Sequence, residues 1–232
     1  MSTEKHIYRG GADTERLFLQ DVEFTMPEGT PITVNKTNIP GVDMDDLVAR
    51  HKARYYLLGL YCRAGYRVLD FPCGSGYASE ILTPLGVTYE GREFDAETVE
   101  YAKKCYQTPQ ATFSVGDLTN PNLKSGTYDL IGCIEGLEHI EMKEQEHLIS
   151  AFYTSLKPGG VLIVSSPENP TGVSGPSVHN PYHKHELTKK DFVTLLESAF
   201  GTGNVELITH KATLSTGVFT LCFYGICHKT QQ

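Results

Sequence analysis

The sequence predicts an α/β fold built around a mostly parallel sheet, and two observations carry that prediction. Short apolar stretches of strand length alternate with amphipathic stretches of helix length from about Tyr66 to Phe200. A glycine turn, Cys73-Gly74-Ser75-Gly76, follows the first of these strands. Such alternation is typical of a parallel sheet that helices cover on both faces, and these sheets bind ligands at the carboxyl ends of their strands.

The N-terminal part of the chain lacks this alternation. Residues 1–42 contain two short β-like pieces, 17–19 and 31–34, and we expect this region to form a cap or strap. The main domain is expected to span residues 43–232 and to begin with a helix over residues 43–62. Acidic residues at the start of that helix suit its dipole, and its leucines recur at helical spacing.

The remaining elements follow in regular order. The expected strands are residues 67–70, 87–90, 111–115, 128–133 and 161–164, and the expected helices follow Gly76 and span about 96–106, 143–156 and 188–200. Thr188 is a suitable N-cap for the last helix. Two later strands, 205–210 and 218–224, can pair antiparallel at a sheet edge. The prediction is a three-layer domain with a mostly parallel seven-stranded sheet and an antiparallel edge strand.

Composition and charge exclude several classes of protein. The formal net charge of −8 argues against a large basic surface for nucleic acid. No apolar run reaches the ~20 residues that a membrane helix needs, and the polar start of the chain predicts no signal peptide. The six cysteines contain no Cys-x-x-Cys pair, which favours reduced thiols in a cytoplasmic protein over a zinc or disulfide framework.

Three features coincide at the ends of the first three strands. Asp70 ends the first strand, and the glycines of the following turn let a ligand approach the backbone closely. Glu93 lies about twenty residues further on, where an acid can accept hydrogen bonds from both ribose hydroxyls. Asp117 follows the third strand, where it could receive an adenine amine. Together these positions predict a site for a nucleoside-containing cofactor.

With these motifs the chain resembles the class I methyltransferase superfamily over residues 66–200. The resemblance includes the motif Leu156-Lys157-Pro158-Gly159-Gly160 before the fifth strand. The resemblance implies a Rossmann-like fold and S-adenosyl-L-methionine as the cofactor. It also implies that the cofactor site is lined by Asp70, Cys73, Gly74, Gly76, Glu93, Phe94, Asp117, Leu118 and Glu135.

Two details test this resemblance against a dinucleotide-binding dehydrogenase. The superfamily usually has glycine where this chain has Pro72, and proline removes one amide donor from the turn. A dehydrogenase prefers three glycines around a pyrophosphate, but Glu80 stands where the third would fall. S-adenosylmethionine has no phosphate, so the relaxed glycine spacing favours the methyltransferase alternative.

The helix before the first strand adds a candidate for the cofactor's carboxylate. Arg50 and Arg54 share one helical face, as do His51 and Tyr55. A cation here can hold the methionyl carboxylate, and Arg54 is the residue we expect to do so. The alternative is that these are solvated surface charges.

The segment after the fourth strand carries the candidate chemistry. Glu135, Glu138 and His139 stand at i, i+3 and i+4, and His183 and His185 follow far downstream. Carboxylates with imidazoles can form a divalent metal site, for Mg²⁺ or another ion. The pattern resembles that of metal-dependent O-methyltransferases of the ubiquinone pathway and of small-RNA 2′-O-methyltransferases. This resemblance implies Glu135, Glu138, His139 and His183 as metal ligands, with His185 as the fallback.

The expected function is therefore O-methylation of a small hydroxylated acceptor, a sugar or glycan precursor. A bound metal would lower the pKa of the acceptor hydroxyl, and an imidazole would take its proton, so Glu135, His139 and His183 are the expected catalytic residues. Glu168 or Asn169, after the fifth strand, could touch the acceptor. Two alternatives stay open: methylation of an RNA terminal ribose, which the acidic charge disfavours, and a non-catalytic cofactor-binding module.

Overall fold

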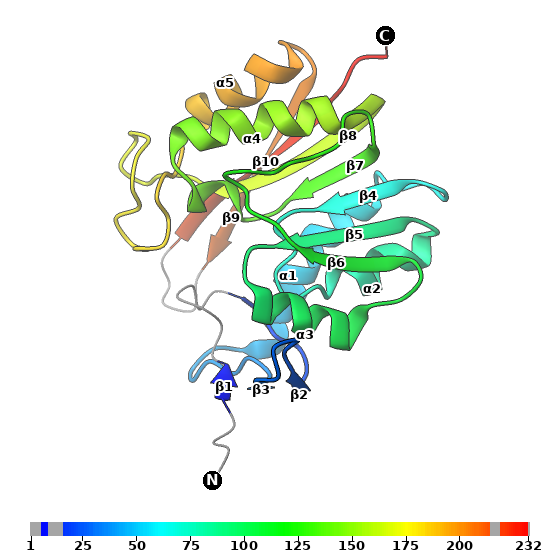
Figure 1. The fold of residues 1–232 in the computed structure, drawn as a ribbon. Coiled ribbons are helices and arrows are strands. Elements are labelled where there is room, and N and C mark those ends of the chain that lie inside the picture. The colour runs from blue at the N-terminus through cyan, green and yellow to red at the C-terminus, as the bar shows by residue number, and fades with distance from the viewer. Residues whose placement is uncertain (1–5, 9–15, 214–218, 232) are drawn as a thin grey trace.

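A seven-stranded sheet forms the centre of the computed structural model, which describes residues 6–8, 16–213 and 219–231 (Figure 1). Its order is β6-β5-β4-β7-β8-β10-β9. The strands are β4 (Arg67–Asp70), β5 (Thr88–Glu93), β6 (Ala111–Val115), β7 (Tyr128–Cys133), β8 (Leu156–Pro167), β9 (Val205–Thr213) and β10 (Phe219–His228). The first five are parallel to one another, and β10 runs antiparallel to both β8 and β9.

Helices cover both faces of the sheet and complete three layers (Figure 1). On one face lie α1 (Met44–Gly59), α2 (Ala78–Leu82) and α3 (Ala96–Tyr106), and on the other lie α4 (Met142–Ser155) and α5 (Lys189–Phe200). Two short 3₁₀ turns, η1 (Thr83–Leu85) and η2 (Leu137–His139), also lie in the described part of this domain. Each face has its own apolar cluster, as expected when amphipathic helices bury one side against a sheet.

The predicted architecture is confirmed. The side chain of Thr188 caps α5, as the sequence indicated, by accepting from the backbone N–H of Asp191. The two late strands do pair antiparallel at one end of the sheet, with β10 inserted between β8 and the edge strand β9. The second strand was predicted too short, since β5 continues to Glu93 and carries that carboxylate to the sheet's functional edge.

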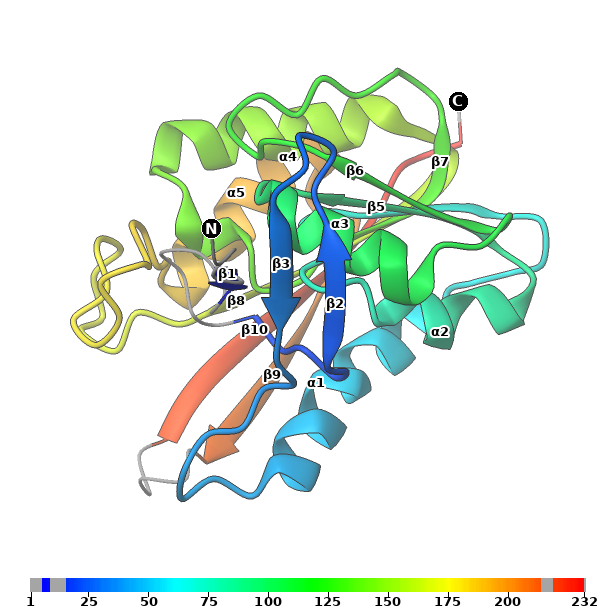
Figure 2. The same cartoon turned by 60° about the horizontal axis from the view of Figure 1, so that its bottom comes forward.

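The N-terminal segment is more regular than the sequence suggested. Residues 17–19 are not a strand; instead β2 (Val22–Thr25) pairs antiparallel with β3 (Pro31–Val34), and β1 (His6–Tyr8) pairs parallel with β3. Figure 2 shows this hairpin against α3. The Phe18 ring packs edge-on against Tyr101 of α3, with centroids 4.8 Å apart. The segment thus shares a core with the rest of the chain, and its separation at residue 42 stays a prediction.

Two further properties concern the chain as a whole. None of the helices in the described part of the chain combines the length and the apolar character that spanning a bilayer requires. All six cysteines are unbridged thiols, and Cys73, Cys133, Cys222 and Cys227 are buried. Burial raises the pKa of the Cys227 thiol to about 12, so this residue behaves as a small apolar side chain.

Candidate functional site

A cavity of about 650 Å³ opens at the carboxyl ends of β4, β5 and β7. Parallel sheets of this type leave a crevice at this edge because the chain turns back over opposite faces from neighbouring strands. Most of the residues that the sequence singled out line this cavity: Arg54, Cys73, Gly74, Glu93, Phe94, Asp117, Leu118, Glu135, Glu138, His139 and His183.

The Glu93 carboxylate is fixed at the cavity wall by backbone amides. Its Oε2 accepts from the N–H of Gly74 at 3.1 Å, and its Oε1 accepts from the N–H of Phe94 at 2.9 Å. Gly74 has φ +53°, in the left-handed region that glycine adopts without strain. Arg16 of the N-terminal segment also donates to Glu93 Oε1, at 2.6 Å. The acid is therefore held rigidly with its oxygens at the cavity.

A second wall of the cavity follows β6. Asp117 Oδ1 accepts from the N–H and the hydroxyl of Thr119, both at 2.8 Å, which fixes its carboxylate. Phe94 and Leu118 also line the cavity, and the Phe94 side chain is 67% exposed. An exposed aromatic ring and a fixed carboxylate in the lining of one cavity are suited to a flat heterocycle with an exocyclic amine.

Two predicted cofactor residues lie outside the cavity lining and support it from behind. Asp70 is fully buried and accepts from the Tyr89 hydroxyl at 2.6 Å. Burial raises the pKa of Asp70 to about 8, against the opposing effect of the Tyr89 and Tyr55 hydroxyls. Gly76 has φ +88°, and a Cβ there would lie 2.8 Å from both the Ala102 Cβ and the Phe113 ring. Its role in the structure is a close approach of the turn to α3 and β6.

Pro72, the departure from the usual glycine pattern, lies in the cavity wall. The Phe71–Pro72 peptide bond is cis. A Cβ on Gly136 would collide with the Pro72 ring, so the proline and this glycine fit together across neighbouring strands. The glycine turn keeps its amide contact to Glu93 in spite of the proline.

Glu135 takes a different position from that expected of a metal ligand. Its Oε2 lies 3.4 Å from an Arg54 nitrogen, and its Oε1 accepts from the Ser165 hydroxyl at 2.6 Å. Burial favours a raised pKa, but Arg54 and Ser165 outweigh it, and the pKa of Glu135 lies below its ordinary value. Glu135 also has φ +50°, a conformation that costs energy for a non-glycine residue and is common at functional sites.

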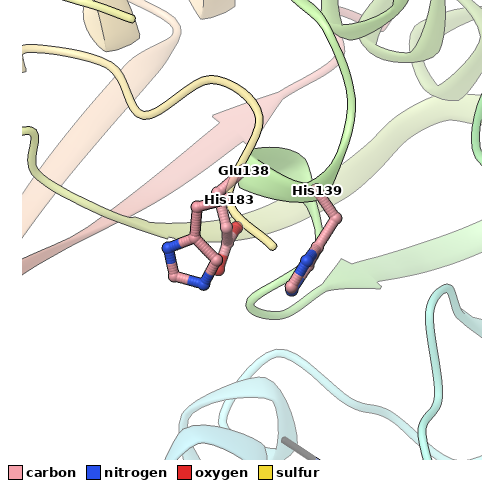
Figure 3. Close-up of side chains that lie close together, drawn as sticks. All are labelled: Glu138, His139 and His183. Atoms are coloured by element: carbon pink, nitrogen blue, oxygen red, sulfur yellow. The ribbon is translucent and has the colours of Figure 1, made fainter. Parts of the chain in front are cut away.

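The other predicted ligands come together. Donor atoms of Glu138, His139 and His183 all lie within 4.8 Å of one another. Figure 3 shows both imidazoles gathered around the Glu138 carboxylate, two residues from η2 and one from the loop before α5. Glu138 is 1% exposed, and burial, followed by the negative charge of Glu135, raises its pKa well above the ordinary value. His185 does not join this group.

Hydrogen bonds join the loop that carries His183 to η2. Gln145 of α4, fully buried, donates to the carbonyls of Leu137 and His185, both within 2.9 Å. The N–H of His185 donates to the Glu138 carbonyl at 3.2 Å. His139 Nδ1 lies 3.3 Å from the Tyr182 carbonyl. These contacts hold two segments more than forty residues apart in one arrangement.

A second cavity, of about 1390 Å³, adjoins the first. The two share His51, Arg54, Glu135, Tyr182 and His183 as lining residues. One wall of the second cavity is apolar and comes from α1 and the β9–β10 pair, with Leu57, Ile208 and Leu221 among its residues. The lining also includes Glu168 and Asn169, both of which the sequence had placed near an acceptor.

Sequence reasoning missed several residues that shape the site. Arg16 lies in a segment whose irregular sequence pattern does not indicate how it packs on the rest of the chain, so its contact with Glu93 could not be expected. Ser165 lies in β8 beyond residue 164, where the sequence predicted that strand to end, so its contact with Glu135 could not be expected. Gln145 is one polar position on an amphipathic helix, and only the fold shows that it is buried.

Comparisons with known proteins agree with this geometry. The family described as a methyltransferase domain matches residues 43–199. A probable S-adenosylmethionine-dependent methyltransferase of Mycolicibacterium smegmatis is 30% identical over 181 residues, 77% of this chain and 68% of the relative. A ubiquinone biosynthesis O-methyltransferase of Xanthomonas oryzae is 32% identical over 62% of this chain, which spans 63% of that relative.

A solved structure shows the same fold. The N-methyltransferase NodS of Bradyrhizobium japonicum, in complex with S-adenosyl-L-homocysteine, has a TM-score of 0.60 and 16% identity over 78% of this chain and 86% of that chain. The family match covers more than half of the chain and includes every strand of the sheet from β4 to β8. The chain therefore belongs to the class I S-adenosylmethionine-dependent methyltransferases and is an enzyme of that family.

Proposed function

We propose that this methyltransferase transfers the methyl group of S-adenosylmethionine to a hydroxyl of a small acceptor. The observation that carries the proposal is the shared wall of the two cavities, where His183 stands beside Glu138 and His139. A cofactor in the first cavity and an acceptor in the second would meet at His183, with His139 beside it on the side of the first cavity. An imidazole in hydrogen-bond reach of a hydroxyl can take its proton.

The first cavity suits each part of the cofactor. Glu93, held by amides, would accept from the ribose hydroxyls, and Asp117 would accept from the adenine amine. The methionyl end carries an ammonium and a carboxylate, and the Arg54–Glu135 ion pair offers both complementary charges at one place. Arg54 would hold the carboxylate and Glu135 the ammonium, so Glu135 serves the cofactor in this proposal.

The cluster of Glu138, His139 and His183 also fits a divalent metal. Within the described part of the chain, no group donates a hydrogen bond to the buried Glu138 Oε2. A buried carboxylate oxygen without a donor is costly unless a cation or proton satisfies it. Two imidazoles and one carboxylate suit a transition ion such as Mn²⁺, Fe²⁺ or Zn²⁺ better than Mg²⁺, which prefers oxygen ligands.

The chemistry needs little beyond positioning and proton removal, because the sulfonium already supplies the leaving group. When bound, a metal at these residues would lower the pKa of an acceptor hydroxyl. With a metal bound, His139 and His183 would be its ligands and would not take the proton; in the metal-free alternative, one of them would orient the hydroxyl and receive its proton at a ring nitrogen. Glu135 and Arg54 would fix the methionyl end of the cofactor.

We propose a sugar or glycan precursor as the acceptor, in a cytoplasmic enzyme. Polar residues of the second cavity, among them Glu168 and Asn180, could offer hydrogen bonds to several hydroxyls, whereas the buried Asn169 side chain is used within its own loop. Its apolar wall supports a second candidate, a hydroxylated aromatic compound, and so do the ubiquinone-pathway relatives. Both candidates present neighbouring hydroxyls to the cluster.

Methyl-labelled S-adenosylmethionine tests the proposal. The enzyme would be incubated with three sets of acceptors: sugars and nucleotide sugars, dihydroxylated aromatics, and RNA with a free 3′-terminal ribose. Mass spectrometry should place the label on oxygen in the first or second set. Transfer only to RNA would replace the proposal by ribose methylation. Tight cofactor binding with no transfer to any set would indicate a binding module.

A further inference from the structure

We propose that Glu186 is a positioning residue that fixes the tautomer and orientation of His183. The inference rests on the proposed function, because His183 has a catalytic or metal-binding part only there. Glu186 Oε1 lies 2.7 Å from His183 Nδ1. The His183 and Glu186 side chains are 13% and 6% exposed, so the pair is largely shielded from water.

The Glu186 backbone is held in place before it meets the imidazole. Its N–H donates to the Gly175 carbonyl at 2.8 Å, and its own carbonyl accepts from the Gly175 N–H at 3.0 Å. The neighbouring Leu187 is buried and its carbonyl accepts from the N–H of Asn169 at 3.1 Å. The carboxylate is therefore presented from a paired backbone, which is the condition for orienting another group.

The contact decides which nitrogen of His183 carries the proton. A carboxylate only accepts, so Nδ1 must donate to Glu186. In the neutral ring the lone pair then lies on Nε2, whether that nitrogen binds a metal or accepts a proton. The donor atoms of Glu138 and His139 lie within 4.8 Å of the one that His183 offers. His139 follows the same pattern, since its Nδ1 faces the Tyr182 carbonyl, another acceptor.

Glu186 thus supplies for His183 what a backbone carbonyl supplies for His139. The two rings stand 5.0 Å apart at 89° beside the Glu138 carboxylate (Figure 3). A carboxylate behind an imidazole also strengthens its basicity more than a carbonyl does. This favours His183 over His139 as the stronger ligand or proton acceptor.

The test measures the tautomer directly, in the protein without metal or cofactor. Nitrogen-15 NMR at a pH where His183 is neutral distinguishes Nδ1–H from Nε2–H, and His183→Gln assigns the signal. The wild type should show Nδ1–H. Glu186→Gln should keep it, because the amide oxygen still accepts, whereas Glu186→Leu should shift the ring toward Nε2–H. An unchanged Nδ1–H signal in Glu186→Leu would overturn the proposal.

Mn²⁺ binding gives a second readout on the same variants. Glu186→Leu should weaken Mn²⁺ about 10- to 100-fold, as removal of a carboxylate behind a metal-binding histidine does, with Glu186→Gln between it and the wild type. Cofactor affinity should be unchanged in both. If Glu186→Leu fails to fold, Glu186→Asp replaces it and should show a mixture of tautomers; a pure Nδ1–H form in Glu186→Asp with wild-type Mn²⁺ affinity would also contradict the proposal.

The outcomes separate this inference from the function beneath it. If no hydroxyl acceptor is methylated but the tautomer still follows Glu186, the proposed function fails and the positioning contact stands. If oxygen is methylated and Glu186→Leu retains the Nδ1–H tautomer and full Mn²⁺ affinity, only the role of Glu186 is wrong.

Discussion

Arg16 reaches from the N-terminal segment to Glu93, with 2.6 Å between its Nη2 and Glu93 Oε1. Both residues line the first cavity, and both side chains are nearly buried. The N-terminal segment therefore forms part of the wall of the first cavity as well as part of the core. Glu93 does not depend on Arg16 for its position, because the amides of Gly74 and Phe94 hold both of its oxygens.

Glu93→Ala should reduce S-adenosylmethionine affinity by at least about 100-fold, because two hydrogen bonds from the ribose to a charged acceptor are lost. Isothermal titration calorimetry measures this. Arg16→Ala is the matched control and should change affinity by less than about 10-fold, since the amides still orient the acid. Unchanged affinity in Glu93→Ala would contradict the site assignment.

Two neighbouring glycines should behave differently. Gly76→Ala should destabilise the fold by about 2 to 4 kcal/mol, because it combines a strained left-handed residue with a clash against Ala102 and Phe113. Gly74→Ala has open space around its Cβ and should cost about 1 to 2 kcal/mol. Urea unfolding without cofactor compares them, and equal losses would show that packing at Gly76 does not matter.

Asp70 should make stability depend on pH. Its pKa of about 8 in the folded protein lies above its ordinary 3.8, so the folded state retains a proton that the unfolded chain releases between these values. This contribution is complete below the ordinary pKa and is lost as pH rises toward 8. Asp70→Asn cannot titrate, so its stability relative to wild type should improve from pH 5 to pH 9. Urea denaturation of both proteins at each pH measures the free energy of unfolding. A difference between the two proteins that stays constant from pH 5 to pH 9 would contradict the prediction.

Metal removal should stop turnover while leaving the cofactor site intact. Dialysis against a chelator should lower methyl transfer by about 100-fold or more, and Mn²⁺ should restore it better than Mg²⁺ because of the two imidazoles. Glu138→Gln and His139→Ala should have the same effect with normal cofactor affinity, and His147→Ala, on the exposed side of α4, should have none. Full turnover after chelation would remove the metal from the account but leave the imidazole as a base.

The sheet was predictable because local patterns determine it. Most strands from β4 to β8 contain a short apolar run, and helices of the right period separate most of them, so a mostly parallel sheet follows from the alternation along the chain. In the N-terminal segment the β-like piece 31–34 is confirmed as β3, but β2 and its pairing with β3 were not predictable, since they depend on packing of the segment against α3. Periodicity within the hairpin gives no hint of that contact.

The candidate site also contains residues whose placement was predictable and residues whose placement was not. Glu93 and Asp117 stand at strand ends, where topology alone brings them together. Glu135 and Glu138 are adjacent in the motif but face different partners, because a left-handed backbone turns Glu135 toward Arg54. Glu186 pairs with His183 within a loop whose backbone is paired with Gly175. No spacing rule for helices or strands could have indicated either arrangement.

A crystal structure with S-adenosyl-L-homocysteine and Mn²⁺ tests the central claim, that His183 on the wall shared by the two cavities and the neighbouring His139 face the transferred methyl. The account predicts anomalous density between Glu138, His139 and His183, the ribose hydroxyls on Glu93, and the cofactor sulfur directed toward the second cavity. Mn²⁺ at another site, or a sulfur directed away from His139 and His183, would contradict it.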